Sequence, residues 1–218
     1  MLSDKGSEVI RRFGIFNNNI PPEQRSYGVP FPVEYLLAPD GTVRGKFFVP
    51  NYQNRVASSS LLMNEFGLAT GPSTTIKSGP VTVRVQFSSE RIFAGQQMGV
   101  VADFAIEPGW HIYGEPLPRR YTVTAIRFDN HYITNYGFKY PPMRNVELKA
   151  VGETLPVYEG NFRADGHFLL KFPLDPGDYV INGTLSFQPC SEQVCEPPRV
   201  IWFKVPIKID PTVAQPSK

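Results

Sequence analysis

Apolar and polar residues alternate with a period of two in the chain from Pro80 onward. Residues 81–87 read Val-Thr-Val-Arg-Val-Gln-Phe, in which every second side chain is apolar. This period matches a β-strand with one face in a core and the other in solvent. The 22 prolines and 18 glycines add frequent turns and disfavour long helices. The pattern therefore predicts a domain of many short strands.

The same pattern extends nearly to the end of the chain. Further strands are predicted at residues 97–105, 121–128, 168–172, 177–187 and 199–209. No convincing helix lies among them, which favours a β-sandwich of the immunoglobulin type. We assign this sandwich to residues 80–210 and treat residues 211–218 as a tail.

The first 67 residues follow a different, mixed α/β pattern. Asp4 is a candidate N-cap for a short helix that ends at Gly14. Two apolar runs at residues 33–37 and 42–48 flank a Pro-Asp-Gly turn, and this arrangement predicts a β-hairpin.

A second helix is predicted at residues 58–66, with Leu61, Leu62 and Phe66 on its apolar face. Residues 68–79 are small, polar and interrupted by proline and glycine, which is typical of a linker.

The only two cysteines, Cys190 and Cys195, are separated by four residues. A disulfide between them closes a loop of about six residues and stabilises a fold by roughly 2 kcal/mol, compared with nearly 5 for a loop of about 100 residues. Pro189, Pro197 and Pro198 restrict the backbone beside the pair. This arrangement favours a redox dithiol that exchanges through a mixed disulfide, with a structural disulfide as the alternative.

Composition excludes several other classes of function. The net charge of +2 is spread evenly, so we expect no nucleic-acid partner. No apolar run approaches the roughly 20 residues of a membrane span. Two cysteines supply half a zinc site and the three histidines lack ligand spacing, so we expect no metal and no other cofactor.

Three ordered motifs carry a family resemblance. Residues 187–190 and 195–198 read Phe-Gln-Pro-Cys and Cys-Glu-Pro-Pro, and residues 104–113 read Phe-Ala-Ile-Glu-Pro-Gly-Trp-His-Ile-Tyr. With the segment at residues 152–160, they resemble the N-terminal domain of the DsbD thiol:disulfide interchange protein family over about 130 residues. The chain departs from the founding members in having four rather than five residues between the cysteines.

The resemblance implies an immunoglobulin-like domain that passes electrons between thioredoxin-fold partners through transient mixed disulfides. Cys190 and Cys195 would be the exchanging pair, and by analogy Cys195 would form the mixed disulfide. Tyr113, with His111 or Trp110, would border the sulfurs. The cap loop that shields the disulfide would be formed by Glu153, Thr154 and Leu155.

A second resemblance covers residues 1–67. The motifs at residues 9–15 (Val-Ile-Arg-Arg-Phe-Gly-Ile) and 27–32 (Tyr-Gly-Val-Pro-Phe-Pro) resemble the C-terminal half of a redoxin, a peroxiredoxin-like thioredoxin fold. Pro32 matches the position of that family's cis-proline. The cysteine-bearing half has no counterpart, so we expect an incomplete thioredoxin-like segment with an unpaired hairpin edge and no peroxidase activity.

Two functions remain open from the sequence. One is an electron-relay domain with thiol:disulfide oxidoreductase chemistry, and the other is a non-catalytic β-sandwich that binds a protein and carries an idle cysteine pair. Localisation is also open, because the resemblance implies the periplasm whereas residues 1–6 are polar and show no signal peptide.

Overall fold

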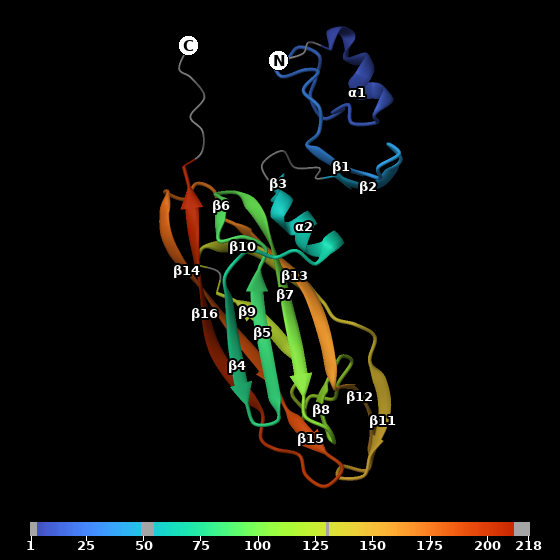
Figure 1. Cartoon of the computed structure of the whole chain (residues 1–218), viewed down its shortest axis with the longest axis vertical. Helices are drawn as coiled ribbons and strands as arrows, with labels where there is room; N and C mark the ends of the chain where they lie inside the picture. The colour runs from blue at the N-terminus through green and yellow to red at the C-terminus, as the bar shows by residue number, and fades with distance from the viewer. Residues whose placement is uncertain (1–3, 49–54, 130, 212–218) are drawn as a thin grey trace. The chain divides into compact units, whose positions relative to one another are not determined.

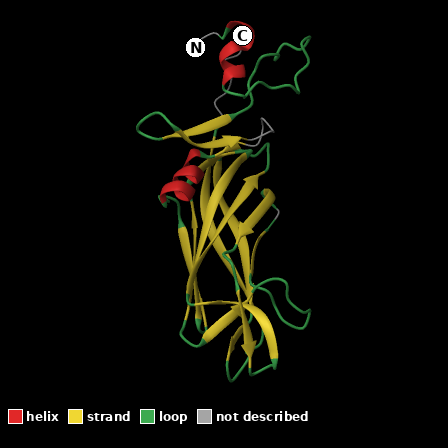
Figure 2. Ribbon diagram, turned by 90° about the vertical axis from the view of Figure 1, so that its right-hand side faces the viewer, coloured by secondary structure: helices red, strands yellow, loops and turns green. Residues whose placement is uncertain are grey.

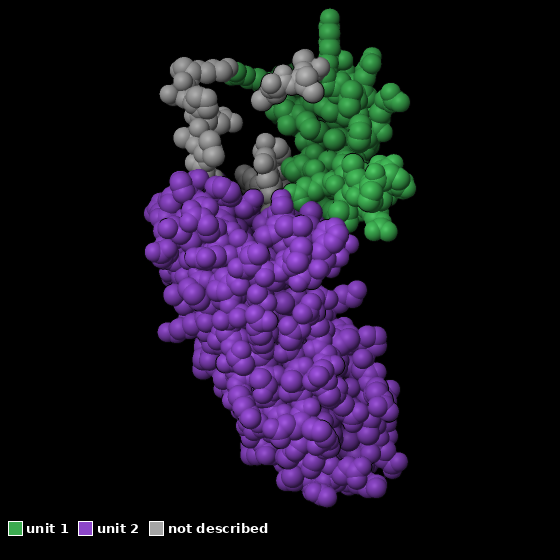
Figure 3. All heavy atoms as spheres, viewed as in Figure 1, with its two compact units in different colours: residues 1–55 green, residues 56–218 purple. Residues whose placement is uncertain are grey.

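The computed structural model describes residues 4–48, 55–129 and 131–211. The chain divides into two compact units, residues 1–55 and residues 56–218 (Figure 3). Strands dominate the described residues, so the prediction of a mainly β protein is confirmed.

The first unit contains one short helix and one hairpin. A 3₁₀ turn (Lys5–Ser7) leads into α1 (Glu8–Arg12), and the hairpin pairs β1 (Val33–Leu37) with β2 (Val43–Phe48) in antiparallel register. The Asp4 carboxylate accepts hydrogen bonds from the backbone N–H groups of Val9 and Ile10, at 3.1 and 3.0 Å. Asp4 therefore satisfies free donors at the start of the helix, as its sequence position predicts.

The predicted hairpin is confirmed, and its turn residues explain it. Gly41 has a φ of +84°, a conformation that costs glycine little. Asp40 Oδ1 accepts a hydrogen bond of 2.9 Å from the Thr42 N–H, and the Ala38 N–H donates 2.8 Å to the Thr42 carbonyl. A Pro-Asp-Gly sequence is enough to specify this turn locally.

The prediction of a cis-proline at Pro32 is wrong. The Phe31–Pro32 peptide bond is trans, and the cis bonds of the described residues are Glu115–Pro116 and Phe172–Pro173. Trans is the lower-energy isomer of an X–Pro bond unless packing selects cis. In the described part of this unit the β1–β2 hairpin has no further strand beside it.

The described residues of the second unit form one helix, α2 (Ser58–Phe66), and three sheets (Figures 1 and 2). The largest sheet has the order β10-β13-β7-β5-β4, with β3 also paired to β7. Its strands are β3 (Arg55–Val56), β4 (Ser73–Ser78), β5 (Val81–Phe87), β7 (Gln96–Ile106), β10 (Ile133–Lys139) and β13 (Asn161–Leu170).

The other two sheets have four strands each, in the orders β6-β16-β14-β9 and β11-β12-β8-β15. The first consists of β6 (Arg91–Phe93), β9 (Ala125–Phe128), β14 (Gly177–Phe187) and β16 (Arg199–Asp210). The second, which we call the small sheet, consists of β8 (Trp110–Tyr113), β11 (Arg144–Leu148), β12 (Glu153–Glu159) and β15 (Pro189–Ser191). It lies at the end of the unit far from α2 (Figure 1).

The helix at residues 58–66 forms as predicted, but it buries a different face. Ser60 and Met63 are buried, whereas Leu62 and Phe66 are about half exposed. The Ser60 hydroxyl accepts a hydrogen bond of 2.7 Å from the Gly99 N–H of β7. A side chain at Gly99 would come within 3.1 Å of Ser60, so glycine permits this close approach. The sequence pattern alone had predicted that the larger apolar side chains, Leu61, Leu62 and Phe66, would form the buried face of the helix.

The structure also differs from the expected linker at residues 68–79. Ser73–Ser78 forms β4 and pairs with β5 over six residues. Its residues are small and polar because β4 is an edge strand with Ile76 as its one buried side chain. Edge strands with few apolar residues resemble linkers in composition.

The core of the sandwich lies between the largest sheet and the four-stranded sheet that contains β14 and β16. The alternate residues of β5 predicted to be inside, Val81, Val83, Val85 and Phe87, are all at most 1% exposed. The Phe168 ring lies 5.1 Å from that of Phe87 and 5.3 Å from that of Phe128, in edge-to-face geometry.

Candidate functional site: a disulfide on the outer face of the small sheet

The small sheet has two faces with different roles. Ile112 of β8 and Tyr158 of β12 are cross-strand neighbours that pack into the main core. Tyr113 and Val157 occupy the opposite, outer face, where they form a second buried cluster with Cys190. Successive residues of a strand point to opposite faces, so β8 joins the sandwich core to the cysteine site.

The outer face holds a disulfide bond between Cys190 and Cys195, whose Cα atoms are 4.1 Å apart. The intervening turn is closed by a hydrogen bond of 2.8 Å from the Ser191 N–H to the Val194 carbonyl. The Glu196 N–H donates 2.9 Å to the Pro189 carbonyl. Cys190 is fully buried, whereas Cys195 is partly exposed, so the two sulfurs differ in their access to a partner.

Tyr113 contacts both sulfurs. Its hydroxyl oxygen lies 2.9 Å from Cys190 Sγ and 3.4 Å from Cys195 Sγ. The side chain is fully buried, and this burial, with smaller contributions from Tyr121 and Glu153, raises the pKa of Tyr113 to about 12. The hydroxyl therefore keeps its proton at neutral pH and can donate it as a hydrogen bond to sulfur.

His111 and Trp110 occupy opposite faces of β8. His111 is 4% exposed, pairs across strands with Cys190, and places its ring 5.8 Å from that of Tyr113. Trp110 packs against the main core, on the face away from the sulfurs. Of the two residues, only His111 lies on the face of the disulfide.

The three residues expected in a cap loop form the start of strand β12. Leu155 is 3% exposed and belongs to the cluster around Cys190, whereas Thr154 is exposed. The Glu153 carboxylate forms an ion pair with Arg120. These residues pair with β11 through backbone hydrogen bonds, so the sequence match did not identify a loop here.

Residues 114–124 contribute covering side chains, a role that the sequence analysis did not predict. The strand predicted at residues 121–128 begins only at Ala125, so residues 121–124 belong to this irregular segment. Leu117 and Tyr121 pack against the cluster that contains Cys190, and the Tyr121 ring lies 5.2 Å from that of Tyr113. The Thr122 N–H donates 3.1 Å to the Gln188 side chain, and the Tyr121 hydroxyl donates 3.3 Å to Glu153. This covering segment borders a cavity of about 460 Å³. The Pro-Leu-Pro sequence at residues 116–118 was the available signal for an irregular segment.

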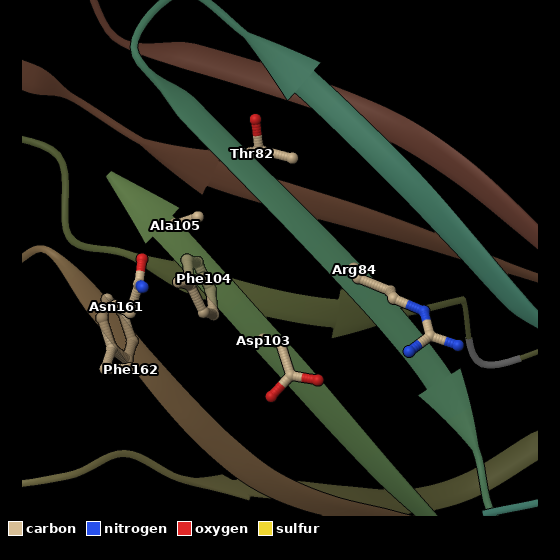
Figure 4. Close-up of a pocket in the computed structure, with 7 residues that line it drawn as sticks. All are labelled: Thr82, Arg84, Asp103, Phe104, Ala105, Asn161 and Phe162. Atoms are coloured by element: carbon tan, nitrogen blue, oxygen red, sulfur yellow. The ribbon is translucent and has the colours of Figure 1, made fainter. Parts of the chain in front are cut away.

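A second hollow, of about 430 Å³, lies on the largest sheet (Figure 4). Arg84 and Asp103 project from adjacent strands there, and Asp103 is already paired with Arg163 at 2.7 Å. None of its lining residues is a cysteine or histidine, so it offers no nucleophile for exchange chemistry. Among the described residues, no cluster of three or more His, Cys, Asp or Glu side chains could hold a metal ion.

Comparison with known families identifies the sandwich. The model of the family described as thiol:disulfide interchange protein DsbD, N-terminal, matches residues 80–206. The chain belongs to this family. The matched region contains both cysteines, Tyr113 and the complete small sheet, so the outer-face disulfide lies within the DsbD N-terminal domain of this chain.

Solved structures with partial similarity include two from related proteins. The N-terminal periplasmic domain of ScsB from Proteus mirabilis is 13% identical with a TM-score of 0.48, over 66% of this chain and 54% of that one. This chain thus spans about half the length of the ScsB structure. The reduced DsbD N-terminal domain from Neisseria meningitidis is 20% identical with a TM-score of 0.34, over 51% and 82%.

A third similar structure is the yeast GGA1 GAE domain, 10% identical with a TM-score of 0.34, over 60% of this chain and 96% of that one. No curated protein sequence matches the chain. No described helix of the DsbD N-terminal domain or of the preceding unit is long and apolar enough to cross a membrane.

Proposed function

We propose that the Cys190–Cys195 pair relays electrons between thioredoxin-fold proteins through mixed disulfides. The observation that carries the proposal is the asymmetric disulfide, with one sulfur fully buried, one partly exposed, and a protonated tyrosine hydroxyl beside both. A structural disulfide does not need one accessible sulfur or a hydrogen-bond donor aimed at the pair.

In the proposed reaction, a partner thiolate attacks Cys195 Sγ. The Cys190–Cys195 bond breaks, a bond forms between Cys195 and the partner sulfur, and the electron pair leaves on Cys190 as a thiolate. The second partner thiol then displaces Cys195. With two protons taken up, the pair becomes a dithiol and the partner a disulfide, and the reverse sequence passes the electrons on.

The covering segment supports a shielding role. Leu155 packs with Cys190 in the buried cluster, and Leu117 and Tyr121 pack against that cluster, so these apolar side chains limit the directions from which a partner thiolate can reach the partly exposed Cys195. We propose that they act together as the shield, in place of a loop at residues 153–155. The cavity lined by Leu117 and Tyr121 offers a docking partner a hollow on the covering segment itself.

For the division of the chain, we propose that the exchange domain begins at residue 56 rather than 80, because α2 and β4 pack on its largest sheet, and that residues 1–55 retain a redoxin-like segment without its cysteine. The hairpin of β1 and β2 and the preceding short helix support the second part. Residues 1–67 contain no cysteine, so exchange is expected to depend on Cys190 and Cys195 alone.

The test is equilibration with a thioredoxin. The oxidised chain is mixed with reduced thioredoxin, the reaction is quenched with acid, and free thiols are alkylated and counted by mass spectrometry. We expect two alkylated cysteines, on Cys190 and Cys195, within minutes, and an intermediate mass equal to the sum of the two proteins. A pair that stays oxidised in the native chain, but is reduced after unfolding, would support the non-catalytic binding module instead.

Removal of the Tyr113 hydroxyl is expected to slow the exchange. A Tyr113→Phe variant keeps the ring but loses the donor that stabilises negative charge developing on the departing Cys190 sulfur. One hydrogen bond contributes about 0.5–1.5 kcal/mol, so the rate constant for reduction should fall roughly two- to tenfold. Stopped-flow measurement with reduced thioredoxin provides the rate. Tyr179→Phe is the matched control, because its hydroxyl donates to the Asp175 carbonyl and lies on β14, away from the sulfurs.

A further inference from the structure

One ring nitrogen of His111 has no hydrogen-bond partner although it is buried. The Nε2 atom is excluded from solvent and makes no hydrogen bond to any residue that the structure describes. Buried polar atoms are nearly always satisfied, so one left without a partner beside a redox-active pair needs an explanation. A hydrogen-bond partner that exists only in the other redox state of the pair supplies one. The groups that could supply this partner lie on the same face of the small sheet as His111.

The strand register places Cys190 opposite His111. The two residues are Cα partners in the antiparallel β8–β15 ladder, so their side chains point to the same face, with Cβ atoms about 4.5–5.5 Å apart. Both side chains are buried, at 0% and 4% exposure. Cys190 is therefore the group that changes its chemistry nearest to this nitrogen.

In the oxidised pair Cys190 has no proton to donate. Its sulfur is bonded to Cys195 and is contacted by the Tyr113 hydroxyl. After reduction Cys190 carries an S–H group, a weak donor that is free to rotate away from Cys195. Reduction therefore gives Cys190 an S–H donor on the same face as His111 Nε2, an acceptor that has no donor in the oxidised pair.

We propose that His111 Nε2 accepts a hydrogen bond from the Cys190 thiol in the reduced pair and thereby shifts the dithiol–disulfide equilibrium toward the reduced form. The inference rests on the proposed exchange function and assigns to His111 the tuning of the redox equilibrium at the same site. The two electrons and two protons come from the partner dithiol, and one of those protons ends on Cys190 and is shared with His111.

The electrostatic surroundings keep His111 in the form that can accept. Burial lowers the pKa of His111, and the charge of Glu159, its cross-strand neighbour on β12, opposes this shift. Glu159 is itself paired with Arg144 at 3.4 Å. The imidazole is therefore neutral at pH 7, and a neutral ring whose Nδ1 carries the proton offers the Nε2 lone pair as acceptor.

The test compares variants in a redox titration with dithiothreitol, which needs no protein partner. His111→Phe keeps a flat ring but has no acceptor, and we expect the equilibrium constant for reduction of the pair to fall roughly three- to tenfold. A tenfold fall corresponds to about 30 mV for a two-electron couple. His111→Gln carries an acceptor oxygen at a similar distance from the backbone and should restore the equilibrium to within about twofold of the original protein.

His167→Phe is the matched control. His167 is also a partly buried histidine whose pKa is lowered by burial, but it lies on β13 in the largest sheet, away from the small sheet. Its replacement should leave the equilibrium unchanged. In the unmodified protein, the ¹⁵N chemical shift of His111 Nε2 should move on reduction in the direction of hydrogen-bond acceptance, while that of His167 should not.

The outcomes separate this inference from the proposed function. Normal exchange with thioredoxin but an unchanged equilibrium in His111→Phe, with no shift at Nε2 on reduction, would overturn the role of His111 and leave the relay intact. Equal losses in the Phe and Gln variants would also overturn it, because the acceptor would then be irrelevant. A pair that dithiothreitol reduces normally but thioredoxin does not would contradict the relay and leave the role of His111 standing.

Discussion

A Cys190→Ser variant is expected to accumulate as a mixed disulfide through Cys195, whereas a Cys195→Ser variant should form at least tenfold less adduct. Cys190 is fully buried beneath Tyr113 and Leu155, so a thiol left there cannot be reached without opening the cluster. Cys195 is partly exposed and keeps its access. With Cys190 replaced, this chain has no second thiol to release the adduct on Cys195, and a thioredoxin that keeps only its attacking cysteine has none either.

The adduct is measured by incubating each variant with a thioredoxin that keeps only its attacking cysteine, activated as a mixed disulfide with thionitrobenzoate, which leaves when a thiol of the variant attacks. Non-reducing electrophoresis and peptide mass spectrometry then identify the linked cysteines. The variant with both cysteines replaced is the control and should give no adduct, because residues 1–67 contain no cysteine. Equal trapping through Cys190 and Cys195 would show that burial does not select the attacked sulfur, and the asymmetry argument would fail.

Truncation of Phe168 in the core is expected to cause a large loss in the free energy of unfolding. Phe168 is fully buried and packs against the rings of Phe87 and Phe128 between the two larger sheets. Replacing a buried phenylalanine with alanine removes apolar contacts and leaves a cavity, which together cost about 3–5 kcal/mol. A Phe168→Ala variant should lose that amount from its free energy of unfolding.

The measurement is urea unfolding followed by tryptophan fluorescence. Both tryptophans, Trp110 and Trp202, lie in the sandwich, so the signal reports that unit alone. Phe172→Ala is the matched control, because its side chain is 61% exposed and its truncation should change stability by less than about 0.5 kcal/mol. A loss below about 1 kcal/mol at Phe168 would contradict the assignment of this aromatic cluster as the centre of the core.

Long alternating strands could be predicted well from the sequence. The strand predicted at residues 177–187 is observed as Gly177–Phe187, and the strand at 199–209 as Arg199–Asp210. Their side-chain period is imposed by the core itself, so it appears directly in the residue order. The Pro-Asp-Gly hairpin was equally accessible because its turn chemistry is local.

Features that depend on contacts distant in sequence could not be predicted, namely the existence of some strands and the face that a helix buries. Strand β4 has few apolar residues, and α2 buries Ser60 rather than Leu62 because a serine hydroxyl fits against Gly99. Short strands such as β8, β12 and β15 have too few residues for a clear period. Propensity is a weak signal, and tertiary packing determines such segments.

For the functional site, the sequence by itself determined that any thiol chemistry of this chain must use Cys190 and Cys195, since the number and spacing of cysteines are properties of the chain. Only the tertiary structure decided which side chains surround them. Register across β8 and β15 sets His111 opposite Cys190 and moves Trp110 to the core face, and the covering segment brings Tyr121 to the site. These neighbours depend on strand pairing and burial between residues far apart in sequence, which no local pattern encodes.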